Sequence, residues 1–389
     1  MNIIQVRQKF PIDGGVEYHI HGLSRRLVKL GHQVSVFTSD RGLDWKASYR
    51  HGTQTLDGIE VRRFAAPLKM FRTLVIPSLL PSLLRDTQGQ IIHAHGFFYP
   101  STDAAALASL LGKRPMVYTP HLQPYSVYTE RGERWARAIY ESTVGRFAFK
   151  VAKRVIAVSE FTKDYMVNYL GVDEGKITVI PPSGVEQNGL GPHPTQSFRD
   201  TVGLNDHKVA LFVGHISPRK GLKHLVRAMP AVLDAIGNVK FVVIGPDRGE
   251  EAALMKLAAR LGTSDSLIFT GHLNHGTVMD AYPTADVFVL PSEYEAFGIV
   301  LLEAMAAGRP VIASRVGGTM DIIQNGQTGL LVDEKDPGQL AQAIIHLLRD
   351  REAAEKLGER AREYAIGKYS WDTIVERTLQ VYREALDGL

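Results

Sequence analysis

A pattern of short apolar runs alternating with helix-like stretches occurs twice along this chain. Each run of β-branched residues precedes a segment of helical periodicity, which is typical of βαβ units and predicts a parallel sheet. The first series of strands is expected at 2–6, 33–38, 91–93, 116–118 and 155–158, and the second at 209–213, 240–244, 266–269, 287–290 and 310–313. The sequence therefore predicts two α/β sheets rather than one.

The two series are separated by a stretch, residues 181–207, that is rich in Pro, Gly, Ser and Asn and weak in periodicity. Such composition is typical of a connection between domains, and 389 residues are too many for a single core to be the default. After Trp371, apolar residues recur at helical spacing and predict an amphipathic helix that packs across a surface. We expect two Rossmann-like domains, at 1–185 and 208–368, joined by a linker at 186–207. A C-terminal helix is expected at 369–389.

The composition excludes several classes of site and location. There is no cysteine, so disulfides, thiolate zinc sites and a cysteine nucleophile are excluded, in keeping with a reducing cytoplasm. The first ten residues, MNIIQVRQKF, resemble a strand rather than a secretory signal. No run of about 18 apolar residues occurs anywhere in the chain. We expect a cytoplasmic protein that does not cross a membrane.

The charge is distributed unevenly. Residues 1–185 hold 24 Lys and Arg against 15 Asp and Glu, a net +9, whereas the rest of the chain holds 21 against 26, a net −5. A positive domain attracts anions, although ordinary solvated surface charge is an equal alternative. The apolar segment 65–85 and the basic helix expected over 131–154 can rest on anionic lipid. A peripheral position on the inner face of a membrane is therefore an alternative to an ordinary acceptor-domain surface.

The strongest local pattern is ADVFVLPSEYEAFGIVLLEAMAAG at 285–308, in which a buried strand leads into a polar loop and then a helix. Gly298 stands where the helix should begin, so the backbone N–H groups that follow it are predicted to hold phosphate. Glu295 and Glu303 lie on either side of this helix start. Carboxylates accept hydrogen bonds from paired hydroxyls, so one can hold a sugar and the other a ribose. Two surface carboxylates are the alternative that spacing alone leaves open.

A second segment, VGHISPRKG at 213–221, follows the first strand of the second series. Arg219 and Lys220 lie in its loop, at the strand end where open α/β sheets bind ligands. Their charge suits a diphosphate leaving group. A basic surface turn is the alternative.

Candidate residues in the first domain follow its strands. Asp13, Gly14 and Gly15 come after the first strand and offer the flexible backbone that a close phosphate approach requires. The full dinucleotide fingerprint is missing, which disfavours a nicotinamide site. His95 and His121 follow the third and fourth strands, although a lone histidine is usually structural.

Motifs of several other enzyme classes are missing. The chain contains no His-Glu-x-x-His, no Asp-x-Asp, no Gly-x-Ser-x-Gly and no phosphate-binding P-loop motif. We therefore expect no metal site and no metal cofactor, and the commonest hydrolase and nucleoside-triphosphatase interpretations are disfavoured.

Taken together, these residues resemble the retaining glycosyltransferases of family 4. The most specific element is the segment EAFGIVLLE at 295–303, followed by AMAAG. It is supported by PVIASRVGG at 310–318 and GQTGLLV at 326–332, and the similarity covers nearly the whole chain. The resemblance implies the GT-B fold, which consists of two facing Rossmann-like domains with parallel sheets and a C-terminal helix crossing back to the first domain.

The resemblance also implies roles for residues of the second domain. Glu295 is expected to contact the transferred sugar and Glu303 the ribose, while Lys220 matches a lysine of the family. The family usually has Gly-Arg where this chain has Gly214 followed by His215, so either Arg219 or a protonated His215 is expected to supply the positive charge. The backbone expected to hold phosphate is that of Phe297, Gly298, Ile299 and Val300.

In the first domain, the resemblance implies that Gly14 and Gly15 lie near the diphosphate and the acceptor. His121 is expected to lie against the donor sugar, with its backbone carbonyl near the reacting carbon. His121, Glu295 and Lys220 are thus the expected catalytic residues. Asp13, His19 and His95 are candidates for the acceptor side.

The implied function is that of a hexosyltransferase. It would move a hexosyl unit from a UDP- or GDP-linked sugar to a hydroxyl of a sugar, glycan or lipid-linked acceptor, with retention at the anomeric carbon. Neither an obligatory metal nor any cofactor beyond the nucleotide-sugar co-substrate is expected, and no nucleic acid partner. A non-catalytic sugar-nucleotide binding protein, a sugar-nucleotide epimerase and a nicotinamide oxidoreductase remain as alternatives.

Overall fold

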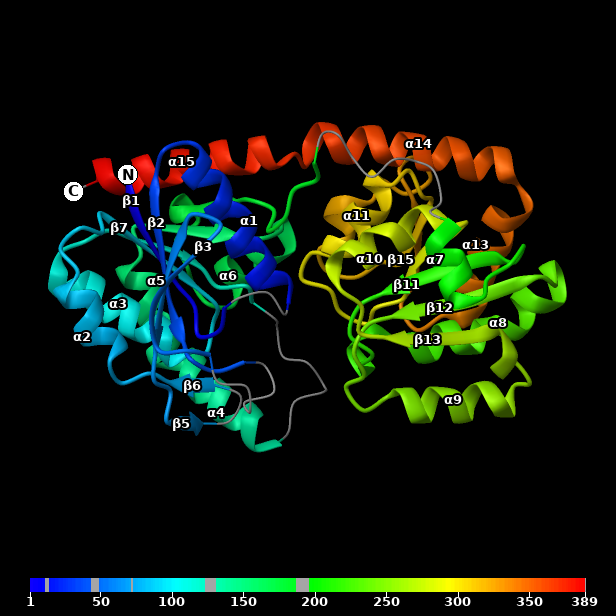
Figure 1. Ribbon diagram of the computed structural model, residues 1–389, viewed down its shortest axis with the longest axis horizontal. Helices are drawn as coiled ribbons and strands as arrows, with labels where there is room; N and C mark the ends of the chain where they lie inside the picture. Colours follow the sequence, from blue (N-terminus) through cyan, green and yellow to red (C-terminus); the bar gives the residue numbers. More distant parts are fainter. Residues whose placement is uncertain (11–13, 43–48, 71–72, 123–130, 187–195, 389) are drawn as a thin grey trace. The chain divides into compact units, whose positions relative to one another are not determined.

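The computed structural model describes residues 1–10, 14–42, 49–70, 73–122, 131–186 and 196–388. The chain forms two compact units: unit 1 comprises Met1–Ser183 together with Trp371–Leu389, and unit 2 comprises Gly184–Ser370. Each unit is a twisted sheet with helices on its faces (Figure 1). Among the helices in the described part of the chain, none combines the length and apolarity needed to span a bilayer.

The sheet of unit 1 has eight strands in the order β10-β9-β8-β7-β1-β2-β4-β3. Its neighbouring strands run parallel except for β3, which pairs antiparallel with β4 at one edge. A separate two-stranded ribbon is formed by β5 and β6. The strands are β1 (Asn2–Val6), β2 (Gln33–Ser39), β3 (Gly52–Leu56), β4 (Ile59–Phe64), β5 (Leu68–Met70), β6 (Thr73–Val75), β7 (Ile91–His95), β8 (Met116–Thr119), β9 (Arg154–Ala157) and β10 (Ile177–Val179).

The central strands of unit 1 are buried on both faces. Side chains alternate along a strand, so Ile3 and Ile91 join one core cluster while Ile4 and Ile92 join the cluster on the opposite face. Burial on both faces explains why these strands have almost continuously apolar sequences. The helices that cover them are α1 (Gly15–Lys29), α2 (Leu79–Arg85), α3 (Pro100–Gly112), α4 (Arg131–Ser142), α5 (Val144–Val151), α6 (Glu160–Asn168), the short η1 (Glu174–Lys176) and α15 (Trp371–Asp387).

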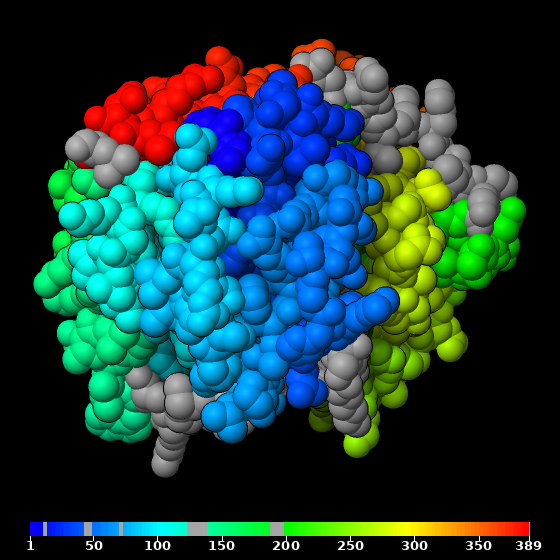
Figure 2. Space-filling model, turned by 60° about the vertical axis from the view of Figure 1, so that its left-hand side comes forward, coloured from blue at the N-terminus to red at the C-terminus, as the bar shows by residue number. Residues whose placement is uncertain are grey.

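The C-terminal helix α15 completes unit 1. It lies beside α1 (Figure 1). In Figure 2 the red surface of the C-terminal residues adjoins the dark-blue surface of the N-terminal residues. Trp371 is buried against Gly22 of α1, where a β-carbon would lie 2.6 Å from the indole ring. Farther along α15, Tyr382 is fully buried and its hydroxyl contacts His93 in β7. The last helix of the chain is therefore part of the first unit's core.

The sheet of unit 2 has six parallel strands in the order β13-β12-β11-β14-β15-β16. The order reverses between β11 and β14, and in open α/β sheets the ligand site lies at the carboxyl ends of the strands at such a switch point. The strands are β11 (Lys208–Val213), β12 (Val239–Ile244), β13 (Leu267–Gly271), β14 (Val287–Leu290), β15 (Val311–Ser314) and β16 (Leu330–Val332).

Helices of unit 2 pack against a single core cluster that includes residues of all six strands. They are α7 (Gln196–Val202), η2 (Pro218–Lys220), α8 (Leu222–Ile236), α9 (Glu251–Arg260), η3 (Ser264–Ser266), α10 (His275–Ala281), η4 (Tyr282–Thr284), α11 (Ile299–Ala306), α12 (Thr319–Ile322), α13 (Pro337–Arg349) and α14 (Arg351–Lys368).

The structure differs from the expected linker. Unit 2 begins at Gly184, and within 186–207 it contains α7 together with Phe198 and Leu204, both buried in the core. The Pro- and Gly-rich composition concealed these two apolar anchors. Residues 196–207 are thus a structural part of unit 2.

One other expectation in unit 1 is also corrected. The basic helix expected over 131–154 is divided into α4 and α5 at Thr143, whose backbone is not helical (φ −125°, ψ −98°). In the segment 65–85, Leu74, Leu79 and Leu83 are buried in the core. These three side chains therefore serve folding.

Candidate donor site and histidine cluster

The donor-site candidates of unit 2 gather at the carboxyl edge of its sheet. Gly214 follows β11 with φ 149°, and a β-carbon on Gly245, which follows β12, would lie 2.0 Å from the Gly214 carbonyl oxygen. Gly221 has φ 65°, and a β-carbon there would lie 2.0 Å from the carbonyl oxygen of Pro291. The loops after β11, β12 and β14 are thus in direct backbone contact, which only glycine permits at these positions.

Lys220 and Glu295 form a buried ion pair at this edge. The Lys220 Nζ donates to Glu295 Oε2 at 2.5 Å, and each residue is 8% exposed. Arg219 lies farther from the carboxylate, with Nη1 3.9 Å from Oε1, and donates to the Tyr294 carbonyl at 3.1 Å. Burial opposes ionisation of Glu295, but the charges of Lys220 and Arg219 outweigh it and lower the pKa of this carboxyl. Glu295 is therefore a carboxylate at neutral pH.

The start of α11 lies next to this ion pair. Gly298 precedes the helix with φ 106°, so the backbone turns sharply into α11. The N–H of Leu301 donates back to the Gly298 carbonyl at 2.9 Å, which leaves the N–H groups of Ile299 and Val300, at the first two helical positions, as the candidates to hold phosphate. The loop is held from behind by Gly318, whose N–H donates to the Glu295 carbonyl at 2.9 Å. A β-carbon on Gly318 would lie 2.4 Å from the Ala296 carbonyl oxygen. Phe297 is buried, whereas Ile299 and Val300 are partly buried.

Glu303 lies on the second turn of α11 and contacts a residue that the sequence did not single out. The hydroxyl of Tyr282 donates to Glu303 Oε2 at 2.5 Å. Burial raises the pKa of Glu303 to about 7, and the Tyr282 hydrogen bond partly opposes that rise. Protonated and ionised forms are therefore both populated near neutral pH.

The protonation state of His215 bears on which cations lie in this candidate site. Burial, together with the charges of Arg248 and Lys220, lowers the pKa of His215 to about 4. In the ligand-free chain this histidine is neutral at physiological pH, which leaves Arg219 and Lys220 as the cations next to Glu295.

Another buried carboxylate next to the site was not predicted. Glu293 accepts from His224 at 2.9 Å and from Lys223 at 2.7 Å, and its side chain is 7% exposed. The hydroxyl of the neighbouring Ser292 is buried without a partner among the described residues. Both residues lie within the 285–308 pattern, but only their position directly after β14 could have suggested them as site residues.

In unit 1, the glycine pair lies at the start of α1, where Gly14 is the N-cap and Gly15 the first helical residue. Asp13 lies outside the described residues. His19 lies on the second turn of the same helix and is 4% exposed. The fold thus brings the acceptor-side candidate His19 to the carboxyl edge of the first sheet.

His19 meets His95 and His121 there, and these three residues are the histidine cluster. His95 ends β7, and its Nδ1 lies 3.3 Å from Nε2 of His121, which follows β8. The ring centroids of His19 are 5.7 Å from those of both other histidines. His121 has φ 46°, an unfavourable region for a residue with a β-carbon and one that is frequent at functional sites. Burial lowers the pKa of all three imidazoles, for His19 to about 4.

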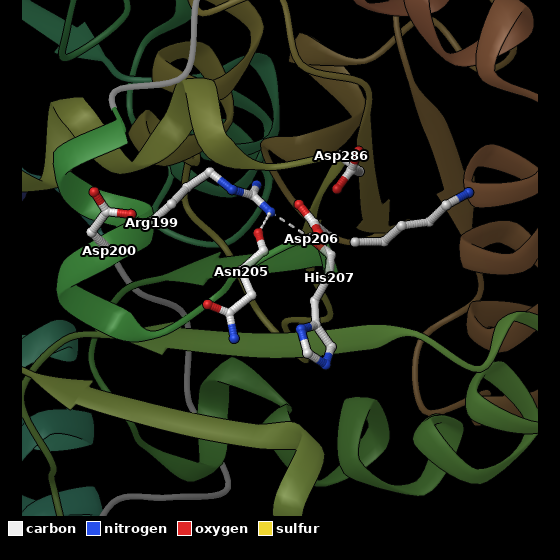
Figure 3. A pocket seen from close by; sticks show the side chains of 7 residues that line it. Arg199, Asp200, Asn205, Asp206, His207 and Asp286 are labelled. Carbon is white, nitrogen blue, oxygen red and sulfur yellow. Dashed lines mark hydrogen bonds between the residues drawn. The ribbon is translucent and has the colours of Figure 1, made fainter.

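A pocket of unit 2 lies away from this chemistry. Its lining includes Arg199, Lys208 and Asp286, at the amino ends of β11 and β14 (Figure 3). Arg199 is already engaged by the carbonyls of Asn205 and His207, and Asp286 accepts from the Val209 N–H. These two side chains are engaged in stabilising the fold, so we do not take this pocket as a candidate donor site.

Comparison with known proteins identifies the family. The model of the family described as Glycosyl transferases group 1 matches residues 195–364, and that of Glycosyltransferase Family 4 matches residues 13–183. An uncharacterized glycosyltransferase of Methanocaldococcus jannaschii is 30% identical over 410 residues, covering 100% of this chain and 99% of that protein. The chain is a family 4 glycosyltransferase.

Two further proteins similar to this glycosyltransferase have named activities. The D-inositol 3-phosphate glycosyltransferase of Acidothermus cellulolyticus is 32% identical over 398 residues, covering 96% of this chain and 86% of that protein. The solved structure of sucrose-phosphate synthase from Thermosynechococcus elongatus matches with a TM-score of 0.80 and 25% identity, covering 100% of both chains. The predicted GT-B fold and hexosyltransferase class are thereby confirmed, and the binding-protein, epimerase and oxidoreductase alternatives are set aside.

Proposed function

We propose that unit 2 binds a UDP- or GDP-linked hexose and that the enzyme transfers the hexosyl unit to an acceptor hydroxyl with retention at the anomeric carbon. The observation that carries the proposal is the buried Lys220–Glu295 pair beside the start of α11. Cations and helix N–H groups suit a diphosphate, and a carboxylate suits sugar hydroxyls.

The proposed chemistry follows from these charges. As the bond from the anomeric carbon to the diphosphate breaks, negative charge grows on the leaving oxygen, where Lys220, Arg219 and the α11 N–H groups stabilise it. Within unit 2, Glu295 is proposed to hold the sugar and Glu303 the ribose. Because protein cations supply the positive charge, transfer is expected to continue after chelation of metal ions.

We propose that the acceptor is a hydroxyl compound that is either anionic or sugar-like. The net charge of +9 in residues 1–185 favours an anion. The relative from Acidothermus cellulolyticus is named for D-inositol 3-phosphate. Phosphorylated polyols therefore join free sugars, glycans and lipid-linked sugars as acceptors to test.

The deciding experiment is a matrix of donors and acceptors. Purified enzyme is incubated with UDP-, GDP- and ADP-hexoses and each acceptor class, and nucleoside diphosphate release is recorded together with the anomeric configuration of the product by NMR. We expect acceptor-dependent release with one base and a product with the donor's configuration. If no combination of donor and acceptor releases nucleoside diphosphate, the transfer proposal is refuted. A product with inverted anomeric configuration would refute retention alone.

Donor binding should depend on pH through Glu303. Ribose hydroxyls bind the ionised carboxylate better, so with a pKa of about 7 for the free enzyme the affinity for the nucleoside diphosphate should rise as pH increases from 6 to 8. The rise should be about tenfold, following the ionised fraction. Calorimetric titration at several pH values measures it.

The control for this pH dependence is Glu303→Gln, which keeps the size of the side chain but cannot ionise. This variant should bind the nucleoside diphosphate more weakly, and its affinity should lack the part of the pH dependence that comes from Glu303. The nucleotide itself also titrates, but it does so equally with both proteins, so the ratio of the two affinities at each pH isolates the effect of Glu303. An equal pH dependence in both proteins would show that Glu303 does not contact the ribose.

We also propose that α4 of unit 1 touches an anionic membrane surface. Trp135 and Ile139 lie one turn apart and are 74% and 62% exposed, an unusual state for large apolar side chains. The double substitution Trp135→Glu with Ile139→Glu should lower binding to anionic vesicles by about tenfold or more in co-sedimentation. The matched control is Leu110→Glu with Leu111→Glu, two exposed leucines of α3. Wild-type protein that stays in the supernatant would remove this proposal.

A further inference from the structure

We propose that His19, His95 and His121 of unit 1 bind one divalent transition-metal ion, with Zn²⁺ as the best fit. One ring nitrogen of each residue takes part in a group whose members all lie within 4.8 Å of one another. The three residues come from α1, the end of β7 and the loop after β8, so no short metal-binding motif marks them in the sequence.

The spacing of two of the ligands already suits a metal. Tetrahedral zinc with Zn–N bonds of about 2.0–2.1 Å places two imidazole nitrogens about 3.3 Å apart. His95 Nδ1 and His121 Nε2 are separated by 3.3 Å. The remaining separations are longer, and a small inward adjustment of the His19 side chain closes them.

A second shell fixes the ligand nitrogen of His95. Its Nε2 lies 2.6 Å from Gln5 Oε1, and the Gln5 amide nitrogen donates to the Tyr382 hydroxyl at 3.2 Å. The amide oxygen can only accept, so His95 Nε2 carries the hydrogen and Nδ1 presents its lone pair toward His121. Metal-bound histidines are typically oriented in this way by an outer hydrogen-bond acceptor.

The third proposed ligand, His19, has a buried ring nitrogen, Nδ1, that lacks a hydrogen-bond partner among the described residues. A buried polar atom left unpaired costs free energy, which a metal bond or an ordered water removes. The backbone of Pro182 already engages this imidazole, and because Nδ1 has no partner that contact uses Nε2.

The surroundings distinguish the three ligands from their neighbours. His93 is also close, but its Nδ1 contacts Tyr382 and its Nε2 contacts Thr119, so neither nitrogen is available. The nearest cation, Arg7, is neutralised by Glu17 at 2.9 Å and therefore repels a metal only weakly. Three neutral imidazoles favour zinc, copper, nickel or cobalt over magnesium and calcium, and the fourth position is left to water.

The test uses the full chain without an affinity tag, first freed of metal with a chelator. Co²⁺ is titrated while visible absorption is recorded, Zn²⁺ is added in competition, and X-ray absorption of the zinc-loaded protein counts the ligands. We expect one ion per chain, a four-coordinate cobalt spectrum and three imidazoles. Loss of a residue that only orients a metal ligand typically weakens metal binding by about 10–100-fold. His19→Gln and His121→Gln each remove a ligand, so each should weaken Co²⁺ and Zn²⁺ binding by more than that.

His346→Gln, at an exposed histidine of α13 in unit 2, is the matched control and should bind as wild type does. Circular dichroism checks that the variants fold, and if one does not, the ligand count of the wild-type protein decides. Absence of a bound ion, a site without three imidazoles, or unchanged affinity in both variants would overturn the proposal. Because the family resemblance also implies a role for His121 in transfer, the ligand count and the cobalt spectrum, rather than transfer activity, decide the metal proposal, and a failure of either proposal leaves the other standing.

Discussion

Replacing Lys220 with alanine is expected to lower kcat/KM by about 10²-fold or more, the effect of removing one preorganised donor from a charged transition state. Lys220 is buried, and its ammonium group is the nearest cation to Glu295, at 2.5 Å. Its loss removes positive charge where the diphosphate leaves and also frees Glu295 from its partner. Steady-state kinetics with the donor found in the screen measures the change.

The matched control for Lys220→Ala is Lys240→Ala. Lys240 lies near the amino end of β12, and its ammonium group donates to the Asp265 carbonyl at 2.7 Å, away from the carboxyl edge where the donor-site residues gather. This variant should turn over at the wild-type rate. Thermal unfolding of both variants separates a catalytic loss from a folding defect, because a buried carboxylate without its partner also destabilises a protein. A folded Lys220→Ala protein with unchanged kcat/KM would remove Lys220 from the donor site.

Replacing Trp371 with alanine should destabilise unit 1 by about 3–5 kcal/mol, as expected for a large aromatic side chain removed from a core. Trp371 is 3% exposed, packs against Gly22 and lies beneath the guanidinium of Arg26 at 4.3 Å. The indole thus joins α15 to α1, and the cavity left behind cannot easily close. Urea unfolding followed by circular dichroism should show the loss.

Trp135→Ala provides the comparison because it makes the same chemical change at a residue that is 74% exposed. Its effect should stay within about 0.5 kcal/mol, the usual range for a surface site. Equal unfolding midpoints for the two variants would contradict the role assigned to α15 in the core of unit 1.

Strands buried on both faces were predictable from the sequence. The bounds of β1 and β14 match those expected, since continuous apolar runs have few other uses in a chain of this composition. Strands at or near the edges were missed: β3 is largely exposed, and β10 and β16 have only three residues each. Their pairing partners, rather than their own residues, hold them in the sheet.

The candidate donor site was likewise predictable only in part. The helix start at Gly298 and the two carboxylates of α11 and its loop could be read locally because strand, loop and helix follow one another in the chain. The partners of those carboxylates could not, since Tyr282 precedes Glu303 by 21 positions and Lys220 is 75 positions from Glu295. The state of His215 also required the structure, because its low pKa comes first from burial.

The sequence by itself determined two α/β units, the helix start at Gly298 and membership of a glycosyltransferase family, because apolar periodicity and contiguous motifs are local properties. Only the tertiary structure decided that α15 completes the first unit, that Glu303 has a pKa of about 7, and that three histidines from separate segments share one cluster. The physical reason is that burial, pKa and ligand geometry depend on neighbours in space, and parallel sheets place distant strand ends side by side.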